Sequence, residues 1–251
     1  MGLDYTGIFA IATYIAVIVS IPYRSLTAIA SPQLARATKE QNQSEAQTLV
    51  HQVSSNLLLI GGLLFFLIWC NIDLIFHILP NGETYAVARN VVFILSLTQL
   101  IVATCTISLT TISCSCYYAF SLLFSLILTV ASLCLNNYLI PLYGMEGAAV
   151  STLLSNALYF ALALIVLRFA CHLRLLNTNA LKTIVLLIIL FALNALWLHF
   201  LPAGNIWCSS IVRTLLLGGS GLAVAYTLRL SPELSKVGES LLKSLKGKSK
   251  E

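Results

Sequence analysis

The fold of this chain is decided by long uncharged stretches such as residues 181–201, which read LKTIVLLIILFALNALWLHFL. A helix that crosses the hydrocarbon core of a membrane needs about 20 consecutive, mostly apolar residues. Residues 181–201 have that length, and their single charged side chain, that of Lys182, lies next to the first position. The stretch therefore predicts a membrane-spanning helix.

Stretches of this kind recur along the chain. Its 251 residues are 59% hydrophobic and 9% charged, with a mean hydropathy of +0.92. Soluble proteins carry about 25% charged residues, so this composition excludes an ordinary soluble domain, and the apolar content excludes a disordered chain. We predict an all-α, polytopic transmembrane bundle over residues 1–230, with about seven spans. The predicted spans cover residues 8–31, 53–75, 91–113, 117–139, 146–169, 181–201 and 207–229.

Proline, glycine and capping residues predict where these helices begin and end. Pro141 and Gly144 mark a break between the fourth and fifth spans. Pro32 is expected to end the first helix, because the residue before a proline is biased away from helical geometry. Ser44 and Gln47 have the spacing of a capping box, which predicts that a helix leading into the second span begins there.

Residues 231–251 predict a basic amphipathic helix that lies on the membrane surface. Ser231 is a suitable N-cap, and Pro232 suits the first helical position. The apolar positions recur at helical spacing: Leu234, Val237, Leu241, Leu242 and Leu245. The opposite face carries Lys236, Lys243, Lys246, Lys248 and Lys250. Much of the net charge of +5 thus lies beside a membrane domain, which predicts lipid rather than nucleic acid as the partner.

The basic residues also predict the orientation of the bundle. Eleven lysines and arginines fall after the first, fifth and seventh predicted spans, whereas the other side holds only Arg89. Because cytoplasmic loops carry the excess of basic residues, we expect the N-terminus outside and the C-terminus in the cytoplasm. No basic leader precedes the first span. Either that span inserts tail-first, or, as we expect, the chain is the C-terminal part of a longer protein.

Three strings resemble segments of one transporter family. They are YTGIFAIATY at residues 5–14, SIPYRSLTAIASPQLA at residues 20–35 and NNYLIPLYGMEGAA at residues 136–149. Their order resembles the C-terminal half of oligosaccharide flippases, the polysaccharide-transport branch of the multidrug/oligosaccharidyl-lipid/polysaccharide (MOP) superfamily. The third string is the most specific of the three.

This resemblance implies one lobe of a two-lobe carrier in the plasma (inner) membrane. Such a carrier flips a polyprenyl-diphosphate-linked oligosaccharide to the outer leaflet for polysaccharide or O-antigen synthesis, by alternating access. The implied partners are this substrate, membrane lipids, a missing N-terminal lobe and glycan-assembly enzymes. One lobe by itself is expected not to transport.

Arg24 is the first candidate for a substrate-binding residue. It lies about seven residues from the inner end of the first predicted span, roughly 10 Å deep at 1.5 Å per residue. Charged residues at such positions are costly and usually functional. The resemblance implies that Arg24 binds the diphosphate of the substrate. The alternatives are snorkelling to inner headgroups or a contact with helix carbonyls. Pro22, two residues earlier, is a candidate hinge.

Four further polar residues lie in predicted spans and are candidates for binding the substrate: Gln99, Asn136, Asn137 and Arg213. The three amides could instead form hydrogen bonds between helices, which contribute about 0.6 kcal/mol each on average. For Arg213 the alternative is snorkelling toward the outer membrane surface.

Other classes of function have weaker support in the sequence. The four histidines form no HExxH or HxxxH pair, and neither a GxSxG nor a Walker motif occurs. We therefore predict no metal, no cofactor and no enzymatic activity. A scaffold or an enzyme of envelope glycan assembly is the second hypothesis. A seven-helix receptor is the third, and the sequence holds no DRY or NPxxY string to support it.

Overall fold

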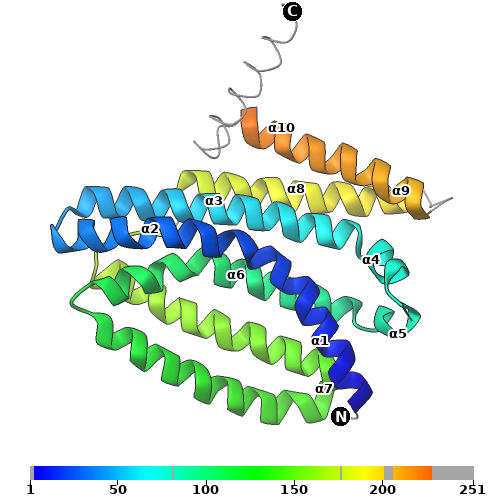
Figure 1. Ribbon diagram of the computed structural model, residues 1–251, viewed down its shortest axis with the longest axis horizontal. Coiled ribbons are helices and arrows are strands. Elements are labelled where there is room, and N and C mark those ends of the chain that lie inside the picture. The colour runs from blue at the N-terminus through cyan, green and yellow to red at the C-terminus, as the bar shows by residue number, and fades with distance from the viewer. Residues whose placement is uncertain (1–2, 81, 176, 201–205, 228–251) are drawn as a thin grey trace, which may run out of the picture.

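The computed structural model describes residues 3–80, 82–175, 177–200 and 206–227, and its regular elements in these ranges are all helices (Figure 1). They are α1 (Leu3–Val17), η1 (Ile18–Ser20), α2 (Ile21–Lys39), α3 (Gln43–Cys70), α4 (Ile72–Ile78), α5 (Gly82–Ala86), α6 (Arg89–Cys114), α7 (Tyr118–Phe169), α8 (Thr178–Phe200), α9 (Ile206–Arg213), η2 (Thr214–Gly218) and α10 (Gly219–Thr227). The predicted tail helix over residues 231–251 lies outside the described ranges.

Five helices are long and apolar enough to cross a membrane: Tyr5–Lys39, Gln43–Cys70, Arg89–Cys114, Tyr118–Phe169 and Thr178–Trp197. These helices are compatible with a multi-pass membrane protein. The predicted count of about seven spans is not confirmed. Within the described part of the last predicted span, residues 210–225 form a shorter apolar helix, Ser210–Ala225, which includes the π-helical segment η2.

Helix α7 folds back on itself at Gly144. The backbone there has φ 58° and ψ −127°, a conformation that side chains disfavour and glycine allows. Ser151 Oγ donates a hydrogen bond to Asn136 Oδ1, although these residues would be about 22 Å apart along a straight helix. Residues 118–143 and 145–169 are therefore two antiparallel arms (Figure 1). The predicted break is confirmed, with Gly144 rather than Pro141 as the turning point.

The first helix does not end at Pro32, so that prediction was wrong. Helix α2 continues through Pro32 to Lys39. Pro32 is exposed, so its ring lies on the outer face of the helix. One face of α2 is buried against α3 in a single cluster, which includes Ala30, Leu34, Ala37, Ala46 and Val50. This burial offsets the loss of one backbone hydrogen bond.

Helix α3 begins two residues earlier than the sequence predicted. Asn42 is its N-cap: its side-chain oxygen accepts from the amide of Glu45 at 3.2 Å, and its side-chain nitrogen donates to the Glu45 carboxylate at 3.0 Å. The predicted box of Ser44 and Gln47 is absent. Gln47 instead binds the backbone of Arg174, accepting from its N–H at 2.8 Å and donating to its carbonyl at 2.7 Å.

The N-cap at Asn42 leads to a prediction about the stability of the protein. Replacing Asn42 with alanine should lower the free energy of unfolding by about 1 kcal/mol, because the first turn of α3 loses its cap. Ser44→Ala should leave stability unchanged, since the Ser44 side chain caps nothing. Thermal unfolding of the purified protein in detergent, followed by circular dichroism, measures both variants. A larger loss for Ser44→Ala than for Asn42→Ala would contradict the structure.

The two ends of the bundle differ in charge. The α2–α3 turn and the segment after α7 lie at the same end, where Gln43 Nε2 donates to the carbonyl of Cys171 at 3.3 Å. We call this the basic end, defined by Arg36, Lys39, Arg168, Arg174 and Lys182. At the opposite end, Arg89 pairs with Asp73 at 3.1 Å, and Asn90 donates to Glu146 at 2.9 Å.

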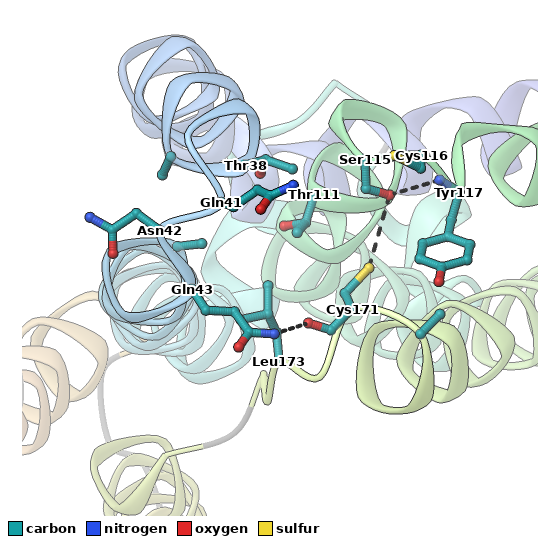
Figure 2. A pocket seen from close by; sticks show the side chains of 13 residues that line it. Thr38, Gln41, Asn42, Gln43, Thr111, Ser115, Cys116, Tyr117, Cys171 and Leu173 are labelled. Carbon is teal, nitrogen blue, oxygen red and sulfur yellow. Dashed lines mark hydrogen bonds between the residues drawn. The ribbon is translucent and has the colours of Figure 1, made fainter.

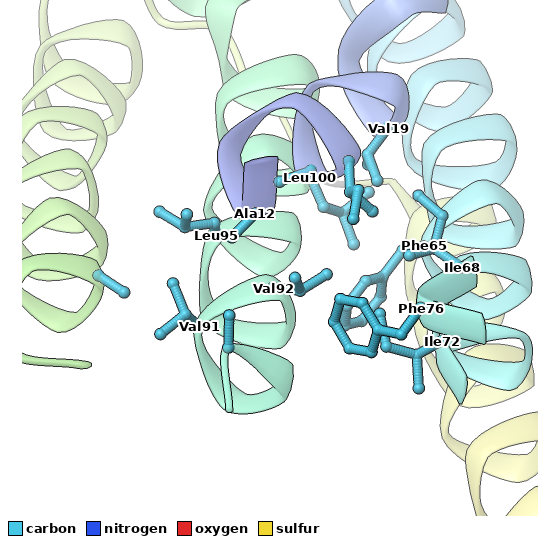
Figure 3. Close-up of a cluster of buried hydrophobic side chains, with 14 of the residues drawn as sticks. Ala12, Val19, Phe65, Ile68, Ile72, Phe76, Val91, Val92, Leu95 and Leu100 are labelled. Carbon is cyan, nitrogen blue, oxygen red and sulfur yellow. The ribbon is translucent and has the colours of Figure 1, made fainter. Parts of the chain in front are cut away.

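An apolar cluster holds the opposite end together. Side chains from α1, α3, α4 and α6 meet there, among them Ala12, Phe65, Ile72 and Val91, all at most 5% exposed (Figure 3). Helix α1 therefore covers the first half of α6, whereas α2 packs against both α3 and α6. The second half of α6 keeps a partly exposed face.

Candidate functional site

A row of polar side chains follows the partly exposed face of α6. Gln99, Thr106 and Thr110 are half-buried, and Ser113 is exposed. Successive members are seven, four and three residues apart, which places them on one face of a helix. We call this row the α6 stripe. It contains one predicted residue, Gln99. The other members were missed, although their spacing was visible in the sequence.

A second polar row follows α2 and contains Arg24. Its members are Ser20, Arg24, Thr27 and Ser31, separated by four, three and four residues, and hence on one face of the helix. We call this row the α2 stripe. Arg24 is exposed and forms no hydrogen bond or ion pair with the described residues. The hydroxyl oxygen of Thr27 is buried and has no hydrogen-bond partner among them.

Pro22 marks the point where the path of the first helix changes. The chain passes from α1 through the tighter 3₁₀ turn of η1 into α2, and Pro22 occupies the first turn of α2. The helix bends at this junction (Figure 1). A break in helix geometry beside Pro22 thus agrees with the sequence, and movement about it stays a prediction.

The two candidate amides of the fourth predicted span, Asn136 and Asn137, differ in exposure and in hydrogen bonding. Asn136 is half-buried and accepts the hydrogen bond from Ser151 of the other α7 arm. Asn137 is exposed on the first arm. Asn136 therefore contributes to closing the hairpin, the structural role that the sequence left as an alternative.

Arg213 contacts a different part of the bundle from Arg24, the end of α3. Its side chain is 5% exposed, and its guanidinium donates to the carbonyl oxygen of Cys70, the last residue of α3. A cation at the C-terminal end of a helix is favourable, because the carbonyls there are unsatisfied. Arg213 does not snorkel outward. No hydrogen bond or ion pair joins any two of the five predicted binding residues in the described chain.

Beside the contact between Arg213 and Cys70 lies a second pair of residues, which the sequence did not reveal. Asn71, which follows Cys70, and Thr214, which follows Arg213, exchange hydrogen bonds of 2.8 and 3.0 Å. Together the two contacts fasten η2 to the junction of α3 and α4. The partners are 143 residues apart, so no local pattern could have predicted them.

Comparisons with protein families, with curated proteins and with solved structures find no match for this chain. The resemblance to flippases therefore rests on the quoted strings alone. In the ranges that the structure describes, no group of three His, Cys, Asp or Glu side chains could hold a metal ion.

Proposed function

We propose that this chain is one lobe of a membrane transporter that flips a lipid-linked oligosaccharide across the plasma membrane by alternating access. The observation that carries the proposal is Arg24, an exposed cation in an otherwise uncharged part of a membrane-length helix. An intramembrane charge is costly unless it is paired or reaches water. The described chain supplies no partner for Arg24. An anionic ligand would supply one.

The diphosphate of a lipid-linked glycan suits this position. A guanidinium binds phosphate oxygens through two parallel, charge-assisted hydrogen bonds. The neighbouring polar groups suit the glycan itself, since hydroxyls and amides can bind sugar hydroxyls. We propose that the α2 and α6 stripes form opposite walls of one substrate groove in the complete carrier. In support, both stripes adjoin residues of the same buried cluster, Ala30 and Leu34 on α2 and Ile107 on α6.

The proposed mechanism uses the groove as half of a central cavity. A second helical lobe, in a longer chain or a separate subunit, would cover the groove, and rocking of the lobes would open it to each membrane face in turn. The direct test is glycan export by the complete carrier with Arg24 replaced. Export that is independent of Arg24 would overturn the proposed anion site.

We also propose that the basic end faces the cytoplasm and that the C-terminus lies on that side. The support is the excess of arginine and lysine at this end, which marks cytoplasmic loops in membrane proteins.

Cys116, exposed in the turn between α6 and α7, offers a native probe of this orientation. Burial raises the pKa of the nearby Cys171 thiol, against a smaller opposing effect of the hydrogen bond to Ser115. Cys171 should therefore react more slowly with maleimides.

Labelling of intact cells tests this orientation. In a variant whose only cysteine is Cys116, a membrane-impermeant maleimide should react only after the cells are permeabilised. In a cysteine-free background, Thr84→Cys in exposed α5, at the opposite end, should react in intact cells. Gel-shift detection of the label reads out both variants. The reverse pattern would invert the proposed orientation.

A further inference from the structure

A polar pocket lies at the basic end, where three segments that are distant in the sequence meet (Figure 2). The α2–α3 turn, the α6–α7 turn and the segment after α7 surround a cavity of about 460 Å³. Cavities of about 300–1,000 Å³ are typical of small-molecule sites. None of the residues described around it carries a formal charge.

Several side chains that line the pocket are neutral and carry hydrogen-bonding atoms that no other described residue uses. The Gln41 amide and the Tyr117 hydroxyl have no hydrogen bond with the described residues. Gln43 uses its nitrogen to hold the Cys171 carbonyl at 3.3 Å, which leaves its side-chain oxygen as an acceptor. Thr111 adds a hydroxyl that donates to Ile107 and can still accept.

This set favours a neutral ligand rich in hydroxyl groups. Carboxamides can donate to and accept from neighbouring hydroxyls at once, and an aromatic ring such as that of Tyr117 provides an apolar face with a polar tip. A phosphate would need arginine, lysine or a cluster of free N–H donors. The lining itself contains no such cation.

The backbone beside the pocket is held in an unfavourable conformation. Gln41 and His172, each at φ 55°, are the two non-glycine residues with positive φ in the described chain. Gln41 closes α2, with its N–H bonded to the Thr38 carbonyl at 3.2 Å and the Asn42 N–H bonded to Ala37 at 2.9 Å. Glycine is the favoured residue in this motif, because a left-handed conformation costs other residues roughly 1–2 kcal/mol. Gln41 thus occupies a position that suits glycine, and its side-chain amide lines the pocket.

We propose that this pocket binds a neutral glycosyl group of the lipid-linked oligosaccharide on the cytoplasmic side, with Gln41 as the principal hydrogen-bonding residue. The proposal rests on the proposed transport function and adds a second position for the substrate, before it enters the groove. Lys39, Arg168 and Arg174 are exposed at the same end of the bundle. Their charges would attract the diphosphate while the sugar occupies the neutral pocket.

Protection of Cys116 tests this proposal directly, because Cys116 lines the pocket. The full chain, with Cys116 as its only cysteine, is placed in lipid nanodiscs free of sugar detergents. The rate of maleimide labelling is measured with N-acetylglucosamine or galactose at up to about 100 mM, since a ligand of this size binds weakly. We expect at least one sugar to slow labelling several-fold, and inorganic phosphate to have no such effect.

Two glycine variants separate binding from folding. Gln41→Gly relieves the backbone and removes the amide, so the variant should be at least as stable thermally while protection is lost. His172→Gly relieves the backbone in the same way and should keep protection. Absence of protection by either sugar, equal protection in Gln41→Gly, or protection by phosphate alone would overturn the glycosyl site. Export assays on Arg24 variants are independent of this result, so failure of the pocket and failure of the transporter proposal are distinguishable.

Discussion

Replacing Arg24 with alanine should lower glycan export by more than about tenfold while the protein accumulates normally in the membrane. Truncating one partner of a charge-assisted pair costs about 2–5 kcal/mol, and 1.4 kcal/mol corresponds to a factor of ten. Folding should be unaffected, because Arg24 is exposed and contributes no hydrogen bond to the described structure. Arg24→Lys should retain part of the activity, since lysine keeps the charge but lacks the planar fork of donors.

The matched control lies on the same helix. Arg36 is 78% exposed and pairs with Glu40 four residues away at 2.8 Å, an interaction that contributes little at a surface. Arg36→Ala should therefore export normally. Each variant is expressed within the complete carrier, in cells that lack their own copy. Surface glycan is quantified and divided by the amount of carrier detected on immunoblots. Normal export by Arg24→Ala at normal protein levels would remove Arg24 from the proposed site.

Replacing Gly147 with alanine should destabilise the fold strongly. A Cβ atom added there would fall on the carbonyl oxygen of Leu139 and 2.7 Å from its carbonyl carbon. Both atoms belong to the backbone of the facing α7 arm, so no side-chain rotation relieves the overlap. We expect the arms to separate and the free energy of unfolding to fall by about 1–3 kcal/mol. A lower midpoint of thermal unfolding in detergent measures this loss.

Gly219 provides the control for this prediction. It lies in α10, and nothing is within 4 Å of the position that a Cβ would occupy. Gly219→Ala should raise stability slightly, by up to about 1 kcal/mol, because alanine favours the helical backbone. If Gly147→Ala were as stable as Gly219→Ala, the close contact between the α7 arms would be refuted.

The parts of the fold that were predictable from the sequence depend on local chemistry. Long apolar runs indicate membrane-length helices whatever their neighbours are. A glycine between two such runs, as at Gly144, indicates a turn because few other residues allow its backbone conformation. The α2–α3 hairpin was not predictable in this way. Pro32 continues a helix there because the opposite face is buried against α3, and that burial depends on tertiary packing.

The same distinction applies to the candidate site. Arg24 was visible because a charge within an apolar run is unusual. The role of Arg213 was hidden, since its partner is a backbone carbonyl 143 residues away. The start of α3 was misplaced because Asn42 and Ser44 both have the chemistry of a cap, and only the packing of Gln47 against Arg174 distinguishes them. The small hydroxyl residues of the two stripes carry no charge, so they did not stand out in the sequence as Arg24 did.

We predict that α1 moves about the bend beside Pro22 as a rigid rod. Helix α1 has 15 residues, so its free end lies about 22 Å from the bend. A rotation of about 10° at the bend would carry that end sideways by roughly 4 Å at this length. Ala12 and Ala16, at 1% and 0% exposure, are among the buried residues of α1. Ile8 and Ile15 of α1 are buried in the apolar cluster of the opposite end, so a small change of angle near Arg24 would displace the far end of α1 and require that cluster to repack.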